Sequence, residues 1–111
     1  ATLLLAQAVA PTYSPDSLVN AASGWPQFSP NTIATLYGEN LSYSTASLNR
    51  GSDPPPQLAG VRILLDFDSA EILYVSPSQV NFRIPPNLAR STVQLTLVRD
   101  GRSGPTIPLP L

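Results

Sequence analysis

The sequence lacks four residue types that carry much of enzyme chemistry: cysteine, histidine, methionine and lysine. Without His or Cys, the chain cannot build a Ser-His-Asp triad, a thiol nucleophile or a Cys/His zinc site. Without Lys, it has neither a Schiff-base amine nor a P-loop. The composition therefore favours a protein that packs and binds over an enzyme, and no cofactor is expected.

Charge is also scarce. Charged residues make up 12% of the chain and the net charge is -1, whereas about a quarter of a typical globular chain is charged. A nucleic-acid surface needs a basic patch, which six scattered Arg residues cannot supply. No apolar run approaches the roughly 18 residues that span a bilayer. We expect an exported, extracellular protein whose partners include neither nucleic acid nor a membrane.

Proline is abundant, with 13 residues in a chain of 111. Each costs about 3 kcal/mol inside a helix, so long helices are excluded. Between the prolines, apolar residues alternate with polar ones, which is typical of half-buried strands. This pattern predicts strands over residues 32–37, 61–68, 71–75, 79–84, 92–99 and 106–111. Their inward positions would be Val61, Ile63, Leu65, Phe67, Val80, Phe82, Ile84, Val93, Leu95 and Leu97.

Turn signals separate these strands at intervals of about ten residues. Asp68 to Ala70 is predicted as a hairpin turn and Asp100-Gly101 as another. Residues 16–23 could form one helical turn or a short strand, and the proline-rich residues 49–57 are expected to be an extended loop. Short strands divided by turns predict an all-β fold, an immunoglobulin-like antiparallel β-sandwich over residues 18–111.

Two runs of sequence carry a family resemblance. They are V-N-A-A-S at residues 19–23 and Y-V-S-P-S-Q-V-N-F-R-I-P at residues 74–85. With them the chain resembles the first half of a C-terminal domain common in secreted acidobacterial proteins, an immunoglobulin-like (IPT/TIG-like) sandwich. The resemblance implies fold and export but no reaction. Weaker spaced matches are Pro30, Ile33, Gly38 and Leu41, and then Pro56, Leu58, Gly60 and Val61.

The first ten residues are uncharged and almost entirely apolar. Three interpretations compete: the remnant of a signal peptide, the first strand of the chain's own sandwich, or a donor strand that completes the sheet of a neighbouring subunit. We favour the donor strand, with residues 11–17 as a linker. Head-to-tail donation does not close on itself and gives a filament. The predicted subunit-interface residues are Leu3, Leu4, Leu5, Ala6, Ala8 and Val9.

The alternative is a monomeric secreted module that binds carbohydrate or a cell surface. Exposed aromatic rings would serve it, and surface glycans are possible partners in either case. The candidates for such a platform are Tyr13, Trp25, Tyr37, Tyr43 and Tyr74. A single Trp in a small sandwich is expected in the core or at an interface.

Three acidic residues form the one weak metal candidate, Asp66, Asp68 and Glu71. Two of them lie on one face of a predicted strand, where a hard cation such as calcium could use their oxygens. The run lacks the glycine and the dense oxygen ligands of a calcium loop. Solvated hairpin charges are therefore the preferred interpretation, and no metal is expected.

Overall fold

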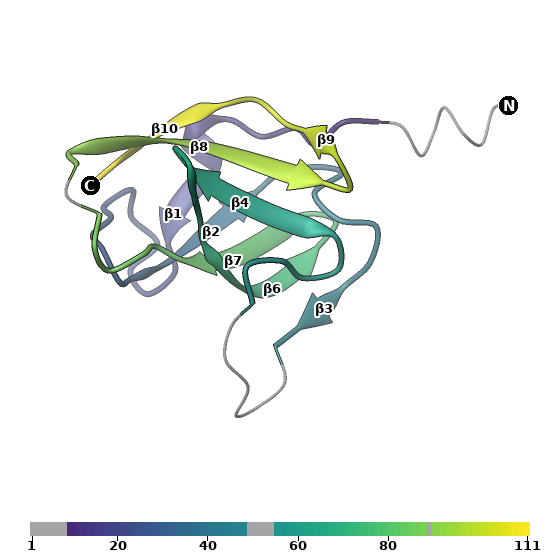
Figure 1. The fold of residues 1–111 in the computed structure, drawn as a ribbon, viewed down its shortest axis with the longest axis horizontal. Helices are drawn as coiled ribbons and strands as arrows, with labels where there is room; N and C mark the ends of the chain where they lie inside the picture. The colour runs from purple at the N-terminus through teal and green to yellow at the C-terminus, as the bar shows by residue number, and fades with distance from the viewer. Residues whose placement is uncertain (1–8, 49–54, 89) are drawn as a thin grey trace, which may run out of the picture.

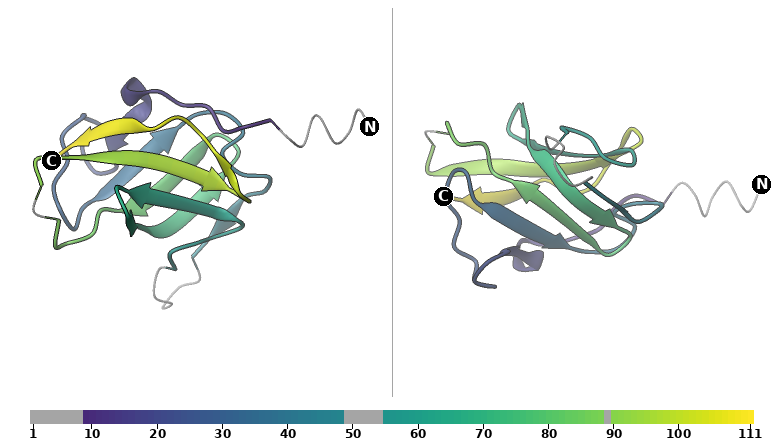
Figure 2. Two further views of the ribbon diagram at one scale, coloured as in Figure 1. Left: turned by 45° about the horizontal axis from the view of Figure 1, so that its top comes forward. Right: turned by 90° about the horizontal axis from the view of Figure 1, so that it is seen from below.

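The computed structural model describes residues 9–48, 55–88 and 90–111. Within them the regular elements are β-strands, apart from the 3-10 helix η1 (Pro15–Ser17). The strands form two antiparallel sheets that pack face to face (Figures 1 and 2). The predicted all-β antiparallel sandwich is confirmed. The predicted extension strand, residues 1–10, falls almost wholly outside the described residues.

The first sheet has the strand order β1-β2-β7-β6-β3 and the second has the order β10-β8-β4-β5, with β9 also paired to β8. Apart from the short β3, β5 and β9, this is the immunoglobulin arrangement, in which four strands face three. The first sheet comprises β1 (Leu18–Asn20), β2 (Ile33–Tyr37), β7 (Gln79–Arg83), β6 (Glu71–Ser76) and β3 (Ala46–Ser47). The second comprises β10 (Ile107–Pro110), β8 (Thr92–Arg99), β4 (Val61–Leu65), β5 (Asp68–Ser69) and β9 (Arg102–Ser103).

The core lies between the sheets and is filled by the alternate residues that the period-two pattern predicts. In the strongest case, β8, inward residues are buried while outward ones are exposed or half-buried. The core runs from Tyr13 to Leu109, and all its members are less than a tenth exposed. Nine of the ten predicted inward residues are buried: Val61, Ile63, Leu65, Val80, Phe82, Ile84, Val93, Leu95 and Leu97.

The tenth, Phe67, was predicted wrongly. Its side chain is 97% exposed because the hairpin turn comes earlier than expected. β4 ends at Leu65, which pairs with Asp68, so Asp66 and Phe67 form the two-residue turn. Asp66 has φ 56°, a left-handed conformation that Asp tolerates better than most residues. Asp68 and Ser69, predicted as the turn, instead form β5.

The turn predicted at Asp100-Gly101 is confirmed. Both residues have positive φ, 47° and 82°, which matches the right-handed twist of a two-residue hairpin. Residues 16–23 contain both predicted alternatives, since η1 is followed directly by β1. Of the proline-rich loop, residues 49–54 lie outside the described part. Pro55, which follows them, accepts a hydrogen bond from the Ile72 amide at 2.8 Å.

Candidate functional site

The described chain enters the sandwich at one end, beside a buried arginine. Arg99 is 1% exposed, and one of its guanidinium nitrogens, Nη2, donates to the Val9 carbonyl at 2.6 Å. Its Nη1 donates to the Asn40 carbonyl, and the guanidinium lies 4.3 Å from the centre of the Tyr43 ring. A planar fork that reaches two carbonyls while stacking on an aromatic ring is a geometry that Lys cannot reproduce. Arg99 therefore fixes the point at which the N-terminal segment leaves the body.

The position of Arg99 follows from the alternation of β8. It lies on the same face as Val93, Leu95 and Leu97 and is buried as they are. A buried charge is costly unless it is hydrogen-bonded. No carboxylate pairs with it among residues 9–48, 55–88 and 90–111, and its Nε has no hydrogen-bond partner there. Two backbone carbonyls and an aromatic face compensate this cation.

Tyr13 ties the same segment to the second sheet. Its hydroxyl accepts a hydrogen bond from the Leu97 amide at 2.8 Å and donates to the Pro105 carbonyl at 2.5 Å. The hydroxyl thereby supplies hydrogen bonds where the pairing of β8 is interrupted between its partners β9 and β10. Its ring packs so closely on Gly104 that a Cβ there would lie 2.5 Å from Tyr13 Cε2. Burial raises the pKa of the Tyr13 hydroxyl, and the Leu97 hydrogen bond partly opposes this rise.

Within residues 11–17, predicted as a linker, residues 11–13 thus pack on the sandwich, while Ser14, Pro15 and Asp16 are exposed. Pro11 and Tyr13 are buried, and Thr12 exchanges two backbone hydrogen bonds with Glu39, at 3.0 and 2.9 Å. The close approach requires Gly38, because a Cβ there would lie 2.3 Å from the Thr12 carbonyl oxygen. Of the six predicted interface residues, Val9 is described and 46% exposed. Leu3, Leu4, Leu5, Ala6 and Ala8 lie outside the described residues.

The outer strands of the sandwich offer little room for another strand. In β10, Ile107 and Leu109 are buried while Pro108 and Pro110 are exposed. Proline has no N–H, so the outer side of β10 lacks ladder donors at both positions. The short β1 is bounded by its own turns, where the Leu18 amide donates to Pro15 and the Asn20 amide to Trp25. β3 and β5 contain two residues each, so edge pairing is limited throughout.

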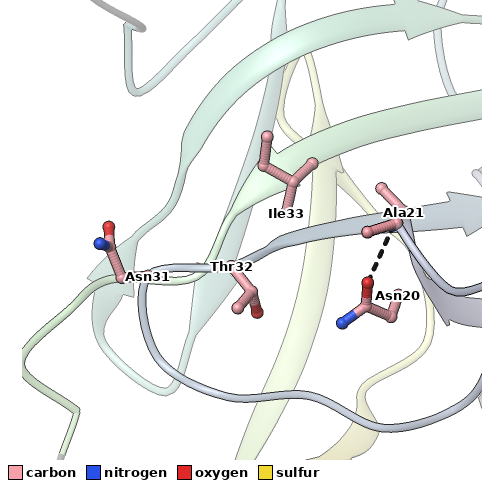
Figure 3. Close-up of a pocket in the computed structure, with 6 residues that line it drawn as sticks. Asn20, Ala21, Asn31, Thr32 and Ile33 are labelled. Carbon is pink, nitrogen blue, oxygen red and sulfur yellow. Dashed lines mark hydrogen bonds between the residues drawn. The ribbon is translucent and has the colours of Figure 1, made fainter.

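The opposite end of the molecule carries a hollow. Figure 1 shows the described chain beginning at the right, near β9, while the loop between β1 and β2 and the C-terminus lie at the left. An open hollow of about 540 Å³ lies between that loop and the start of β2 (Figure 3). Its lining is mostly apolar and carries no charge. The lining residues are Asn20, Ala21, Ala22, Asn31, Thr32 and Ile33.

The five candidate platform aromatics do not come together. Trp25 is 67% exposed in the β1–β2 loop. Tyr37, the last residue of β2, and Tyr43, which lies against Arg99, are also exposed but belong to the Arg99 end. Tyr13 is in the core and Tyr74 is half-buried. The single tryptophan is therefore outside the core, and no shared platform forms from these five side chains.

The three acidic residues of the metal candidate have separate surroundings. Asp66 accepts a hydrogen bond from the Gln94 amide at 2.8 Å and pairs with Arg90. The Gln94 bond, assisted by Arg90, holds the Asp66 pKa below its usual range. Glu71 pairs with Arg83 at 3.2 Å. Within the described part of the chain, no group of three or more Asp or Glu residues could hold a metal ion.

The polar residues of the long signature run bond mainly to one another. Ser76 Oγ donates to the Gln79 carbonyl at 3.3 Å and accepts from the Ser78 backbone N–H, so it stabilises the turn between β6 and β7. Asn81 Oδ1 accepts from Gln79 at 3.1 Å and from Thr35 at 3.0 Å. These bonds join β7 to β2 on the outer face of the first sheet. The run therefore has a structural explanation.

Sequence reasoning missed the roles of Tyr13 and Arg99. A signal for Arg99 existed, because the alternation of residues 92–99 places it at an inward position. For Tyr13 there was none, since its partners lie 84 and 92 residues away. Comparisons with family models, curated proteins and solved structures yield no match to this chain, so the resemblance to the acidobacterial domain stays a prediction.

Proposed function

We propose that this chain is the structural subunit of a secreted extracellular filament, whose subunits join head to tail by donating residues 1–10 to a neighbour. The observation that carries the proposal is that the described sandwich already has its own first strand. β1 pairs with β2 in that position, through Leu18 opposite Leu36 and Asn20 opposite Ala34. The described strands also fill the core with their own side chains. An apolar segment that precedes such a sandwich is therefore better placed to bind a neighbouring subunit than to add to its own sheet.

The attachment of residues 9–13 supports the same proposal. Arg99 holds Val9, Glu39 pairs with Thr12, and Tyr13 is bonded to both β8 and the segment before β10. A segment under load in a filament needs a firm attachment to its own subunit. These contacts distribute that attachment over both sheets.

Composition supports export and durability. The chain has no oxidisable sulfur, and its net charge is -1. Its prolines restrict the unfolded chain and so favour the folded state. No helix in the described residues has the length and apolar character to cross a membrane. None of these features suggests a reaction, so a structural role is preferred to an enzymatic one.

The test is removal of residues 1–10. The truncation also removes the Val9 carbonyl that Arg99 binds, so a thermal melt first establishes that the truncated chain is folded. We expect it to be a monomer, while the full chain forms filaments in negative stain and sediments as a polymer. The double variant Leu3→Asp/Leu5→Asp should behave like the truncation, because two charges cannot enter an apolar contact without a large desolvation cost. A matched control places the same two charges on the exposed positions Ser69 and Ser103 and should still polymerise.

Filaments formed by the truncated chain would overturn the proposal. A full chain that stays monomeric at all concentrations, with a saturable sugar ligand, would favour the alternative carbohydrate-binding module. The observation on its side is the 67% exposed Trp25, because an exposed indole can stack on a sugar ring. Trp25→Ala would then abolish sugar binding and leave the fold intact.

A further inference from the structure

We propose that the hollow between the β1–β2 loop and the start of β2 receives the apolar residues 1–10 of a second copy of this chain. The inference rests on the proposed filament and names its acceptor surface. Three features of the described residues carry it: the chemistry of the hollow, its place in the molecule, and the closure of the neighbouring sheet edge.

The hollow offers apolar contact and few free hydrogen-bonding groups. The side-chain amide of Asn20 is already hydrogen-bonded within the loop. Its Nδ2 donates to the Gln27 carbonyl at 3.0 Å, and its Oδ1 accepts from the Ala22 backbone N–H at 2.9 Å. Thr32 Oγ1 donates to the Ser29 carbonyl at 2.5 Å. Among the six lining side chains, this leaves only the side-chain amide of Asn31 without a hydrogen bond to another described residue. A sugar needs several polar partners for its hydroxyls, so these residues suit an apolar occupant better.

The backbone around the hollow is also occupied. The backbone N–H of Ala21 donates to the Ile33 carbonyl at 2.9 Å, and the backbone N–H of Asn31 donates to the Ile84 carbonyl at 2.8 Å. The Ile84 amide in turn donates to Thr32 at 2.8 Å. A donated segment would therefore be held here by side-chain burial more than by a long ladder. Ile33, which is 37% exposed, and the exposed Ala22 would provide that surface.

The occupant matches in charge and in size. Residues 1–10 carry no charge, and Leu3, Leu4 and Leu5 supply three adjacent apolar side chains. The hollow has no charged lining residue, and its volume of about 540 Å³ falls within the 300–1,000 Å³ typical of ligand pockets. Because Arg99 of its own subunit holds Val9, the reach depends on the eight residues ahead of Val9. Fully extended, they would span about 26–29 Å at most, enough to cross a contact between two subunits and enter the next one.

The position of the hollow makes the contact directional. Residues 9–13 are attached to the body at the Arg99 end, whereas the hollow lies at the other end of β2 (Figures 1 and 3). An interface between two different surfaces of the same chain is heterologous and generates an open filament when its rotation does not close. Donation into this hollow would thus give the head-to-tail order that the proposed function requires.

The experiment compares two single Asp substitutions in the full chain. Ile33→Asp places a charge in the hollow, and Ser47→Asp places one on β3, the edge strand at which a donated strand could instead add. We expect Ile33→Asp to raise the critical concentration for assembly about tenfold or more, and Ser47→Asp to leave it unchanged. Ala22→Arg, in an exposed loop, repeats the test without risk to the core, and thermal melting confirms that each variant is folded.

A cross-link gives the contact directly, since the chain has no native cysteine. Differently tagged Leu5→Cys and Ala22→Cys chains, mixed and oxidised, should form a disulfide dimer carrying both tags. Leu5→Cys mixed with Ser103→Cys, whose cysteine lies at the Arg99 end, should not.

Loss of assembly in Ser47→Asp but not in Ile33→Asp or Ala22→Arg would show that the segment adds at β3, and would overturn the inference. Normal assembly of all three variants would also overturn the inference, provided that removal of residues 1–10 still abolishes filaments. Filaments that persist after that removal would instead overturn the proposed function itself, so the two failures are distinguishable.

Discussion

At the scale of single residues, the attachment of the N-terminal segment depends on two side chains. Tyr13 bridges a donor and an acceptor that the strand ladder leaves unpaired, and Arg99 bridges two carbonyls from loops far apart in the sequence. Buried polar groups are costly when a partner is removed, because the remaining group loses its water without gaining a bond. Both residues therefore give sharp predictions.

Tyr13→Phe should lower the free energy of unfolding by about 1–3 kcal/mol, since the Leu97 amide and the Pro105 carbonyl lose their shared partner. It should also remove part of the alkaline sensitivity. Because burial raises the Tyr13 pKa above its ordinary 10.0, the folded state binds the proton more tightly than the unfolded state does. The contribution of Tyr13 to stability is therefore constant below a pH of about 10 and is lost as the pH rises through the folded pKa.

Denaturant melts from neutral pH to beyond 10 would check this. Tyr37→Phe is the control, since that side chain is exposed and the loss of its hydroxyl should leave the free energy of unfolding unchanged. Equal alkaline slopes in wild type and Tyr13→Phe would contradict the assignment.

Arg99→Met should destabilise the protein by about 1–3 kcal/mol, because the carbonyls of Val9 and Asn40 lose their donor. Arg99→Lys should recover only part of this, since one ammonium group lacks the planar fork. Amide exchange at Thr12, whose N–H bonds to Glu39, should accelerate in both variants. In the control Arg102→Met, at an exposed position of β9, stability should stay within about 0.5 kcal/mol. Unchanged exchange at Thr12 in Arg99→Met would refute the anchoring role.

At the scale of elements, the short strands and prolines control which edges are open. β10 pairs with β8 through Ile107 opposite Leu95 and Leu109 opposite Val93, and its two prolines alternate with them. Natural sheets use proline on edge strands to prevent uncontrolled pairing. A protein that polymerises through one specific contact benefits from such protection, because every other edge contact would compete with the productive one.

Replacing both prolines by threonine should therefore increase disordered association without a loss of stability. Pro108→Thr/Pro110→Thr restores two backbone N–H groups on the outer side of β10, where a second chain could pair. Light scattering of the variant in the background lacking residues 1–10 isolates this effect from filament growth. Pro26→Thr, in an exposed loop, is the control. A double variant that stays as monodisperse as its parent would show that the two prolines do not limit pairing at this edge.

At the scale of the whole molecule, the two ends of the sandwich differ in chemistry. One end holds the anchored start of the described chain, with Arg99, Tyr13 and Thr12. The other holds the mostly apolar hollow beside Ile33, and the same β1–β2 loop exposes Trp25. This polarity is what a head-to-tail subunit requires, and the same sandwich without it would serve equally well as a monomeric module.

Much of the fold was predictable from local pattern. Period-two alternation located the six longest strands to within a residue or two at most ends, because side chains of a strand alternate between core and solvent. The Asp100-Gly101 turn was predictable for an equally local reason, its preference for positive φ. The strand over residues 61–68 failed at its end, because alternation cannot show where a chain reverses. Asp66 could take a left-handed conformation, and Phe67 was left in solvent.

What the sequence alone determined, then, is the period of the strands and the absence of long helices, which depend on neighbours within a few residues, and the lack of Cys, His, Met and Lys, which is a matter of composition. Tertiary structure decided the rest. It gave Tyr13 partners 84 and 92 residues away and Arg99 a partner 90 residues away. It also separated Trp25 from Tyr37 and Tyr43 and shaped the hollow at Ile33. These outcomes depend on which strands become neighbours in space, and that is fixed only when both sheets pack around one core.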